Sequence, residues 1–314
     1  MSGVVTLGET MALMGSTGFG PLSHERTMSL GIGGSESNVA IGLSRLGTET
    51  TWIGKVGTDP LGDLVLRELA AEGVRVLAVR DQEAPTSLMV KERRTSTDTR
   101  VWYYRKANAG GRLRIDEVDF DVIRNANLLH LTGISPALSD GMAETTFEAI
   151  RVAKEAGVPV SFDLNFRSKL WSREQARETY RRIIPQTDIV FAGDDEASIA
   201  VGEAEAPVHF AHELVTLGAG AAVVKRGAHG AVAVVDGKEY EREAIRVNVV
   251  DTVGAGDAFV AGYLAEHLLG ADVDACLQTA VTTGAYACLV PGDWEGAPRR
   301  HELALLNGEE PVSR

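Results

Sequence analysis

The stretch DTVGAGDAFVAGYL, residues 251–264, decides the fold of this chain. Its glycines predict a turn, and the apolar residues after them recur at helical spacing up to Gly270, which is placed to end a helix. Upstream, the β-branched segment 244–250 predicts a strand that enters the core. Gly254 and Gly256 let the backbone come close to a ligand, and N–H groups at a helix N-terminus bind phosphate. The stretch therefore predicts a strand, an anion-binding turn and a helix.

Asp257 lies on the first turn of the expected helix, directly after the glycine turn. A carboxylate there repels a phosphate, so it needs another purpose. It suits a group that accepts a hydrogen bond from an attacking hydroxyl, as phosphoryl transfer to an alcohol requires. Aspartate is also a common helix cap. Both interpretations of Asp257 are open on this stretch alone.

A second segment, GGSESNVAIGLSRLG at 33–47, predicts a glycine turn followed by a helix that Ser35 or Ser37 can cap. A capped helix accounts for the segment locally. In the functional interpretation, Asn38 points its amide toward sugar hydroxyls while the glycines admit the sugar closely. The spacing of a Walker A loop occurs at 42–48, but its lysine is missing, and a dinucleotide fingerprint fails at Glu36.

Together, the two segments resemble the two signatures of the ribokinase-like carbohydrate kinases, the phosphofructokinase B family. The resemblance extends from the first strand to about Asp293. It implies a three-layer α/β/α fold with a mainly parallel sheet and a small β-sheet lid, and it implies ATP and Mg²⁺ as cofactors. It assigns catalysis to Asp257 with Gly254, Ala255 and Gly256, and the sugar site to Gly34, Ser35, Asn38 and Asp257.

Composition and pattern agree with a cytoplasmic enzyme of one domain over residues 1–314. Strand and helix patterns alternate along most of the chain, which predicts a parallel sheet covered by helices on both faces. The net charge of −13 argues against nucleic acid or an anionic membrane as a partner. Two cysteines and the lack of a long apolar run imply neither a disulfide framework nor a membrane span.

Two pieces, roughly 11–33 and 86–106, interrupt the alternation and predict the small β-sheet lid. A small sheet with an apolar face usually finds a partner. We therefore expect a homo-oligomer, at least a dimer, joined through lid residues Leu13, Met14, Leu88, Val90 and Trp102.

Substrate choice depends on YYRKANAGGRL (103–113) and FDLNFRSKLW (162–171). Tyr103 and Arg105 alternate on an expected strand, and Arg167 follows the end of another. Two converging arginines suit a carboxylate, although most arginines form ordinary surface ion pairs. Within the family this combination resembles the 2-keto-3-deoxygluconate kinases, which implies that Tyr103, Arg105 and Arg167 bind a sugar acid, with Asp293 near the substrate.

The nucleotide site follows from the resemblance more than from local pattern. It assigns ATP binding to Asn165, Arg167, Lys225, Gly227, Gly230, Gly254, Gly256, Thr283 and Gly284. Glu196 matches the family residue that organises Mg²⁺ through water, but Gly193 stands where asparagine is usual, which puts the metal site in doubt.

The sequence thus predicts an ATP-dependent kinase that phosphorylates the C6 hydroxyl of 2-keto-3-deoxygluconate. The alternatives are a kinase of a neutral sugar such as fructose or ribose, and a non-catalytic sugar-binding regulator on the same fold.

Overall fold

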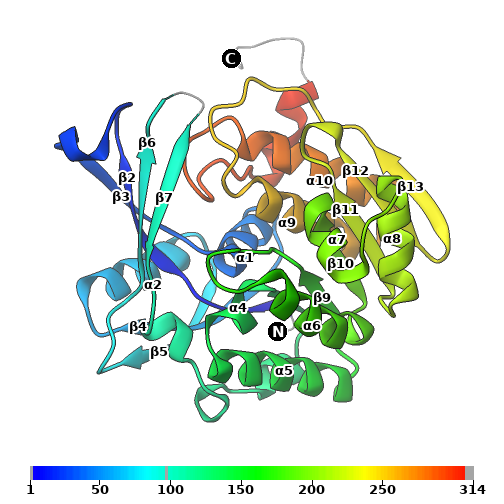
Figure 1. The fold of residues 1–314 in the computed structure, drawn as a ribbon, viewed down its shortest axis with the longest axis horizontal. Helices are drawn as coiled ribbons and strands as arrows, with labels where there is room; N and C mark the ends of the chain where they lie inside the picture. Colours follow the sequence, from blue (N-terminus) through cyan, green and yellow to red (C-terminus); the bar gives the residue numbers. More distant parts are fainter. Residues whose placement is uncertain (1–2, 96–97, 308–314) are drawn as a thin grey trace.

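The computed structural model describes residues 3–95 and 98–307 and folds them around two β-sheets (Figure 1). The larger sheet has nine strands in the order β13-β12-β11-β10-β9-β8-β1-β4-β5. Its strands are β1 (Val4–Leu7), β4 (Thr50–Gly57), β5 (Arg75–Asp81), β8 (Leu128–Thr132), β9 (Val160–Asp163), β10 (Ile189–Gly193), β11 (Ala221–Lys225), β12 (Ala231–Val235) and β13 (Lys238–Arg242). Only the β11–β12 and β12–β13 pairs are antiparallel among these strands. The expected mainly parallel sheet is confirmed.

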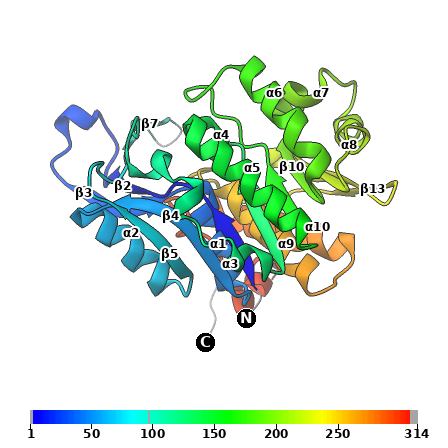
Figure 2. The ribbon, with the colours of Figure 1, turned by 90° about the horizontal axis from the view of Figure 1, so that it is seen from below.

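Helices cover both faces of the large sheet and give three layers (Figures 1 and 2). The short helix α4 (Ile134–Leu138) follows β8. One face packs against α3 (Asp121–Arg124), α5 (Asp140–Glu155), α6 (Arg173–Ile183), α7 (Asp194–Val201) and α8 (Pro207–Thr216). The other packs against α1 (Ser35–Arg45), α2 (Pro60–Ala71), α9 (Ala255–Leu268) and α10 (Val273–Ala287). Strands buried on both faces explain the runs of valine, isoleucine and alanine in the sequence.

The smaller sheet, which we call the lid, has four strands in the order β3-β2-β6-β7 and lies to one side of the large sheet (Figure 1). Its strands are β2 (Met11–Ser16), β3 (Met28–Gly33), β6 (Leu88–Arg93) and β7 (Thr99–Tyr104). The β2–β3 and β6–β7 pairs are antiparallel, and β2 pairs with β6 in parallel. The expected small sheet is confirmed.

The two faces of the lid carry different residues because side chains alternate along a strand. Register places Leu30, Met14, Val90 and Trp102 in one row across all four strands, with Leu88 two residues along on the same face. Leu13 lies on the opposite face, where it is buried with Met11, Met89 and Val101. The expectation that Leu13 and Met14 share an apolar face is therefore wrong, because adjacent residues of a strand point to opposite faces.

One local prediction failed, and one strand was not predicted. Segment 244–250 is irregular rather than a strand, because β13 already forms the edge of the sheet and the chain then crosses toward the glycine turn. Only Ile245 of this segment packs against the core, while Val249 and Val250 are exposed. Strand β5 was missed, although its partly buried residues pair with β4 in parallel at the other edge.

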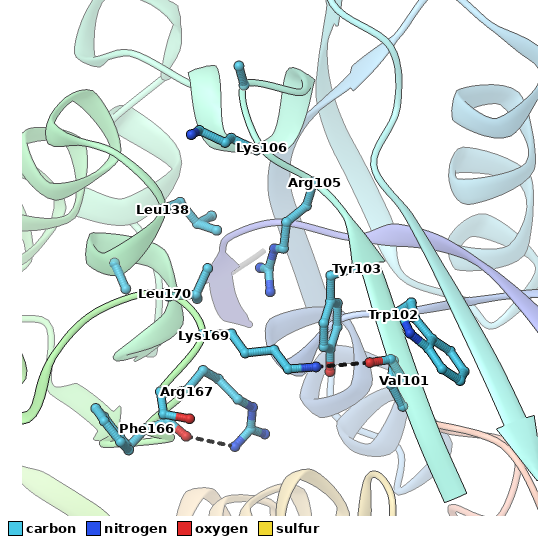
Figure 3. A pocket seen from close by; sticks show the side chains of 13 residues that line it. Val101, Trp102, Tyr103, Arg105, Lys106, Leu138, Phe166, Arg167, Lys169 and Leu170 are labelled. Atoms are coloured by element: carbon cyan, nitrogen blue, oxygen red, sulfur yellow. Dashed lines mark hydrogen bonds between the residues drawn. The ribbon is translucent and has the colours of Figure 1, made fainter. Parts of the chain in front are cut away.

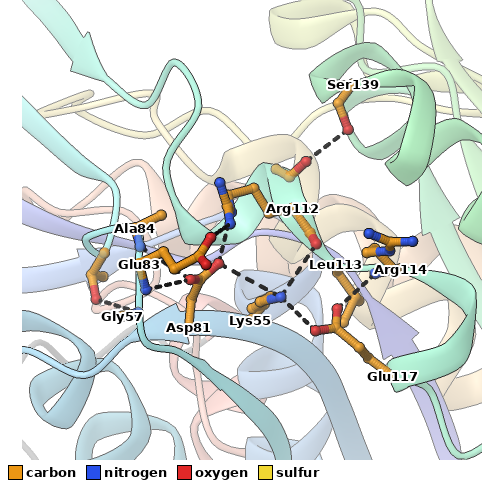
Figure 4. Close-up of polar contacts among 12 residues, drawn as sticks. Lys55, Gly57, Asp81, Glu83, Ala84, Arg112, Leu113, Arg114, Glu117 and Ser139 are labelled. Atoms are coloured by element: carbon orange, nitrogen blue, oxygen red, sulfur yellow. Dashed lines mark hydrogen bonds and ion pairs between the residues drawn. The ribbon is translucent and has the colours of Figure 1, made fainter.

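A buried charge network anchors the chain where it leaves the lid (Figure 4). Lys55 of β4 lies 2.5 Å from Glu117 and 3.6 Å from Asp81 of β5. Arg112 also contacts this cluster, because its Nε donates to Asp81 Oδ2 at 2.8 Å. Desolvation of buried charges is costly and is offset only while the partners stay in place, so this network fixes residues 112–117 against the large sheet.

Candidate active site

The glycine turn at the start of α9 adopts the geometry that the sequence predicts. Gly254 has φ +76°, and a Cβ there would lie 1.7 Å from the carbonyl oxygen of Asp293, so no other residue fits. The N–H groups of Gly256 and Asp257 donate to no acceptor within residues 3–95 and 98–307. Two free amides at a helix N-terminus form a binding site for an anion.

Asp257, on the first turn of α9, is held by two polar side chains, one of which is bonded to a third. Its two carboxylate oxygens accept hydrogen bonds from Ser35 Oγ at 2.6 Å and Asn38 Nδ2 at 2.8 Å. Asn165 in turn donates to Ser35 Oγ at 2.6 Å. Burial raises the pKa of Asp257 above its ordinary value, and the two hydrogen bonds partly offset that effect.

These bonds decide between the two interpretations of Asp257. The N-cap of α9 is Gly254, and no side chain caps the helix. The carboxylate of Asp257 is bonded to α1 instead, so capping does not explain it. The expectation that Ser35 or Ser37 caps α1 is wrong. The N-cap is Gly34, which has no side chain to form the bond. Ser35 donates to Asp257 instead, and Ser37 donates to the Gly34 carbonyl.

Gly34, directly after β3, lets the chain pass close to the connection between β1 and β2. A Cβ on Gly34 would lie 2.4 Å from the carbonyl oxygen of Glu9. Its N–H donates to Asn38 Oδ1 at 3.4 Å, which fixes the amide whose other end bonds Asp257. The structure therefore brings the predicted sugar residues Gly34, Ser35 and Asn38 together around the predicted catalytic carboxylate.

Lys225, the last residue of β11, provides a cation next to the glycine turn. Its Nζ lies 3.6 Å from the position of a Cβ on Gly256 and donates to both oxygens of Asp163, at 2.8 and 2.6 Å. Burial lowers the pKa of Lys225, but the carboxylates of Asp163, Glu196 and Asp257 outweigh it, and the net shift is upward. A fixed ammonium at this place suits the negative charge of a phosphate.

A pocket of about 880 Å³ lies between lid strand β7 and the loop after β9 (Figure 3). Tyr103 and Arg105 line it from the lid side, and Arg167 lines it from the loop side. Within the described residues Arg167 forms no ion pair, and its Nη1 donates to the carbonyl of Phe166 at 3.1 Å. The structure thus brings together the three residues predicted to bind the sugar acid.

Arg105 is held in place by a residue that sequence reasoning missed. It lies just beyond β7, with its guanidinium 5.5 Å from the Tyr103 ring centre, and forms an ion pair with the buried Glu9. Glu9 also accepts a hydrogen bond from Ser87 Oγ at 2.6 Å. The Nε of Arg105 has no partner in the described part of the chain. Glu9 therefore holds the guanidinium in one orientation on the lid side of the pocket.

Lys169 is a second missed residue of this pocket. Its Nζ donates to the Val101 carbonyl at 3.1 Å and lies 5.5 Å from the Tyr103 ring centre (Figure 3). Its position in the loop after β9, beside the predicted Arg167, was the available signal, because ligands gather at the carboxyl ends of parallel strands.

Asp293 lies between the lid and the glycine turn. Its carboxylate packs on Gly33, where a Cβ would lie 2.2 Å from Oδ2, and its carbonyl packs on Gly254. Burial raises the pKa of Asp293 to about 7, with Lys91 opposing the shift. The residue predicted near the substrate therefore borders both signature segments.

A second pocket, of about 460 Å³, lies beyond Lys225 and is lined by Phe166, Arg173, Gly193, Asp194, Asp195, Glu196, Lys225 and Arg226. The carboxylate of Glu196 accepts from the N–H of Phe166 at 3.0 Å and of Gly193 at 2.7 Å. Asp194 Oδ1 is buried without a partner among the described residues. In those residues, no group of three histidine, cysteine or acidic side chains is placed to hold a metal ion.

The other predicted nucleotide residues are spread around this end of the site. Gly227 and Gly230, both with positive φ, form the turn between β11 and β12. Gly284 borders the Ala255 carbonyl, whereas Thr283 is buried between α10 and α9 and donates to the Thr279 carbonyl. The assignment of these residues to ATP stays a prediction.

Comparison with known proteins agrees with this geometry. The model of the pfkB family carbohydrate kinases matches residues 1–300. The chain belongs to this family. It is 38% identical over 305 residues to the 2-dehydro-3-deoxygluconokinase of Bacillus subtilis (strain 168), which covers 96% of this chain and 94% of that protein. It is 33% identical over 314 residues to the 2-dehydro-3-deoxygalactonokinase of Haloferax volcanii, with 99% of each chain covered.

Solved structures show the same architecture. A protein named as a ribokinase II of E. coli, crystallised with ATP and Mg²⁺, superposes on this kinase with a TM-score of 0.91 at 26% identity, covering 98% of this chain and 99% of that one. The described helices of this kinase are all too short or too polar to span a bilayer.

Proposed function

We propose that this kinase transfers the γ-phosphoryl group of ATP to the C6 hydroxyl of 2-keto-3-deoxygluconate. The observation that carries the proposal is the arrangement of the site: a buried carboxylate beside two free helix amides on one side, and two arginines that line a pocket on the other. The names of the two curated relatives support a 2-keto-3-deoxy sugar acid, since 2-dehydro-3-deoxygluconate is another name for this substrate.

In this proposal Asp257 orients the attacking hydroxyl and accepts its proton. Ser35 and Asn38 hold the carboxylate in one orientation, so it reaches the transition state without rearrangement. The N–H groups of Gly256 and Asp257 receive the oxygens of the transferred phosphoryl group, and Lys225 balances their charge. Positioning and electrostatics supply most of the catalysis in such reactions.

ATP and Mg²⁺ occupy the region of the second pocket around Lys225 in this proposal. The acidic lining of the second pocket fits a magnesium ion that keeps most of its water, because Asp194 has a buried oxygen without a partner and Glu196 lies next to it. Bound Mg²⁺ would neutralise charge on the phosphate oxygens. Glu196 would act on its waters, and its two backbone hydrogen bonds keep the carboxylate in place.

Arg105 and Arg167 give the preference for an acid over a neutral sugar. A carboxylate binds the planar guanidinium group through paired hydrogen bonds, whereas the hydroxyls of fructose or ribose have no charge to match it. Glu9 holds Arg105 in position before the substrate arrives, so little side-chain entropy is lost on binding.

A coupled assay of ADP release, with 2-keto-3-deoxygluconate, fructose and ribose as acceptors, tests the proposal. We expect the highest kcat/KM with the sugar acid. Faster turnover with fructose or ribose would support the neutral-sugar alternative. No ADP release with any sugar in the presence of Mg²⁺ would support the non-catalytic regulator.

We also propose that two copies associate through their lids, in the cytoplasm. In the outer row of Leu30, Met14, Val90 and Trp102, Leu30 is 54% and Trp102 39% exposed, and such an apolar row on a small open sheet suits contact with a second copy. The free thiols of Cys276 and Cys288 suit a reducing compartment.

Sedimentation tests the association of the lids. Wild type should sediment as a dimer at micromolar concentration, and Leu30→Lys should sediment as a monomer. Leu269→Lys is the control, because Leu269 is an exposed leucine outside the lid. A monomeric wild type would contradict the proposal.

A further inference from the structure

Lys91 is a buried lysine that the proposed chemistry does not use. It lies on lid strand β6, on the face that points toward the body, and is only 4% exposed. Its Nζ lies 2.6 Å from Asp251 Oδ2 and 3.7 Å from Asp293 Oδ1, and it donates to the Gly292 carbonyl at 3.0 Å. A single lid side chain therefore contacts two separate loops of the body.

Both of these loops support the glycine turn. Asp251 begins the signature segment, and its Oδ1 accepts from the N–H of Val253 at 3.1 Å, directly before Gly254. On the other side, the carbonyl of Asp293 packs against Gly254 so closely that a Cβ would collide with it. The ammonium of Lys91 thus joins the two segments between which the turn is held.

We propose that Lys91 is a positioning residue for phosphoryl transfer, which sets the geometry of the glycine turn through Asp251 and the 291–293 loop. Because Lys91 belongs to the lid, the proposal means that the anion site at Gly256 is correctly formed only when the lid is seated on the body. This inference rests on the proposed role of the glycine turn in holding the transferred phosphoryl group.

The physical reason is the cost of leaving a buried charge alone. Without Lys91, the carboxylate of Asp251 loses its cation in a place from which water is largely excluded, since Asp251 is also buried. The loop must then move to find solvent or a new donor. A shift of about 1 Å at catalytic groups is enough to reduce a rate by about a hundredfold. Binding of ATP and sugar involves many other contacts and depends less on this turn.

Lys91→Met tests the proposal, with Lys55→Met as the matched control. Lys55 is also a buried lysine between two acids, Glu117 and Asp81, but it lies on β4, next to the edge strand β5 of the large sheet (Figure 4). Both substitutions remove a buried cation, so both should lower Tm. We expect kcat to fall about a hundredfold for Lys91→Met, with KM for ATP and sugar changed less than about threefold, and kcat to be unchanged for Lys55→Met.

A double variant keeps the proposal testable where Lys91→Met folds poorly. Lys91→Met/Asp251→Asn removes the unpaired charge of Asp251, the nearer of the two acids, and should recover part of the loss in Tm. Its kcat should stay as low as that of Lys91→Met because the turn still lacks its support. A kcat within about threefold of wild type in either variant, or an equal loss in Lys55→Met, would overturn the role of Lys91. Wild-type protein that releases no ADP would instead overturn the proposed kinase function.

Discussion

The two ends of the site, the body end around Asp257 and the lid end around Tyr103, are built differently. At the body end, Asp257, Ser35, Asn38 and Asn165 are buried, and each makes a hydrogen bond to another member of the group. At the lid end, Tyr103 is 37% exposed, and neighbouring Arg167 is exposed on a loop. The groups assigned to chemistry are therefore assembled before a ligand binds. On the recognition side only Arg105 is held in advance, by Glu9, whereas the exposed Arg167 takes its final position with the substrate. Substitutions at the two ends should separate kcat from substrate preference.

The largest effect is expected at Asp257. Asp257→Asn keeps the size of the side chain but cannot accept a proton, so kcat should fall by about a hundredfold to ten-thousandfold while KM changes little. Asp274→Asn is the control, because Asp274 also lies in the first turn of a helix, α10, and is exposed. Steady-state ADP release measures both. Near-normal kcat in Asp257→Asn would mean that the carboxylate is structural.

Two glycines at the ends of α9 test whether the turn at the body end is shaped for an anion. Gly254 and Gly270 both have φ +76°, but only at Gly254 would a Cβ meet another atom within 4 Å. Gly270→Ala should cost about 1–2 kcal/mol of stability from left-handed strain and leave kcat intact. Gly254→Ala should lower kcat about a hundredfold as the turn shifts. Equal kinetics of the two variants would argue against a catalytic turn.

Glu36 provides a smaller test, of how completely water is excluded from the body end of the site. It lies on α1, and its Oε1 accepts hydrogen bonds from Thr132 and Ser135, both at 2.7 Å. Burial raises the pKa of Glu36 from 4.5 to about 7, with the hydrogen bonds opposing the shift. The folded protein therefore keeps a proton that the unfolded chain loses, and stability falls as pH rises from about 4.5 to about 7.

Glu36→Gln should remove this part of the pH dependence, because glutamine is neutral and still accepts both hydrogen bonds. A shift from 4.5 to about 7 corresponds to about 3 kcal/mol, so the variant should be the more stable protein at neutral pH. Denaturant unfolding at pH 5 and pH 8 measures the difference. An unchanged slope of stability with pH would show that Glu36 is hydrated. Asp293, whose pKa is also raised to about 7, should keep its own share of the slope.

Local patterns were sufficient to predict the fold and the glycine turn. Alternating strands and helices, the glycines at 254 and 256, and the glycine that ends α9 are all features of neighbouring residues. The failed strand at 244–250 shows the limit of this reasoning, because a β-branched composition does not say whether a sheet has a free edge to receive it.

Local sequence patterns could not predict which residues contact the site residues. The hydrogen bond between Ser35 and Asp257 joins residues 222 positions apart, and the one between Lys91 and Gly292 spans 201 positions. Only the family resemblance placed Ser35 and Asp257 in one site. Glu9 and Lys91 belong to neither signature segment, and a buried acid or lysine cannot be recognised from a strand pattern without its tertiary partner.

The central claim is that this kinase recognises a sugar acid through its lid. The ratio of kcat/KM for 2-keto-3-deoxygluconate to that for fructose, measured in wild type and in Arg105→Ala, tests it most directly. Since a charge-assisted hydrogen bond contributes about 1.5–3 kcal/mol, we expect a ratio well above one in wild type that falls about tenfold to a hundredfold in Arg105→Ala. Arg105→Lys should recover little, because an ammonium lacks the paired N–H groups. An identical ratio in wild type and Arg105→Ala would contradict the claim.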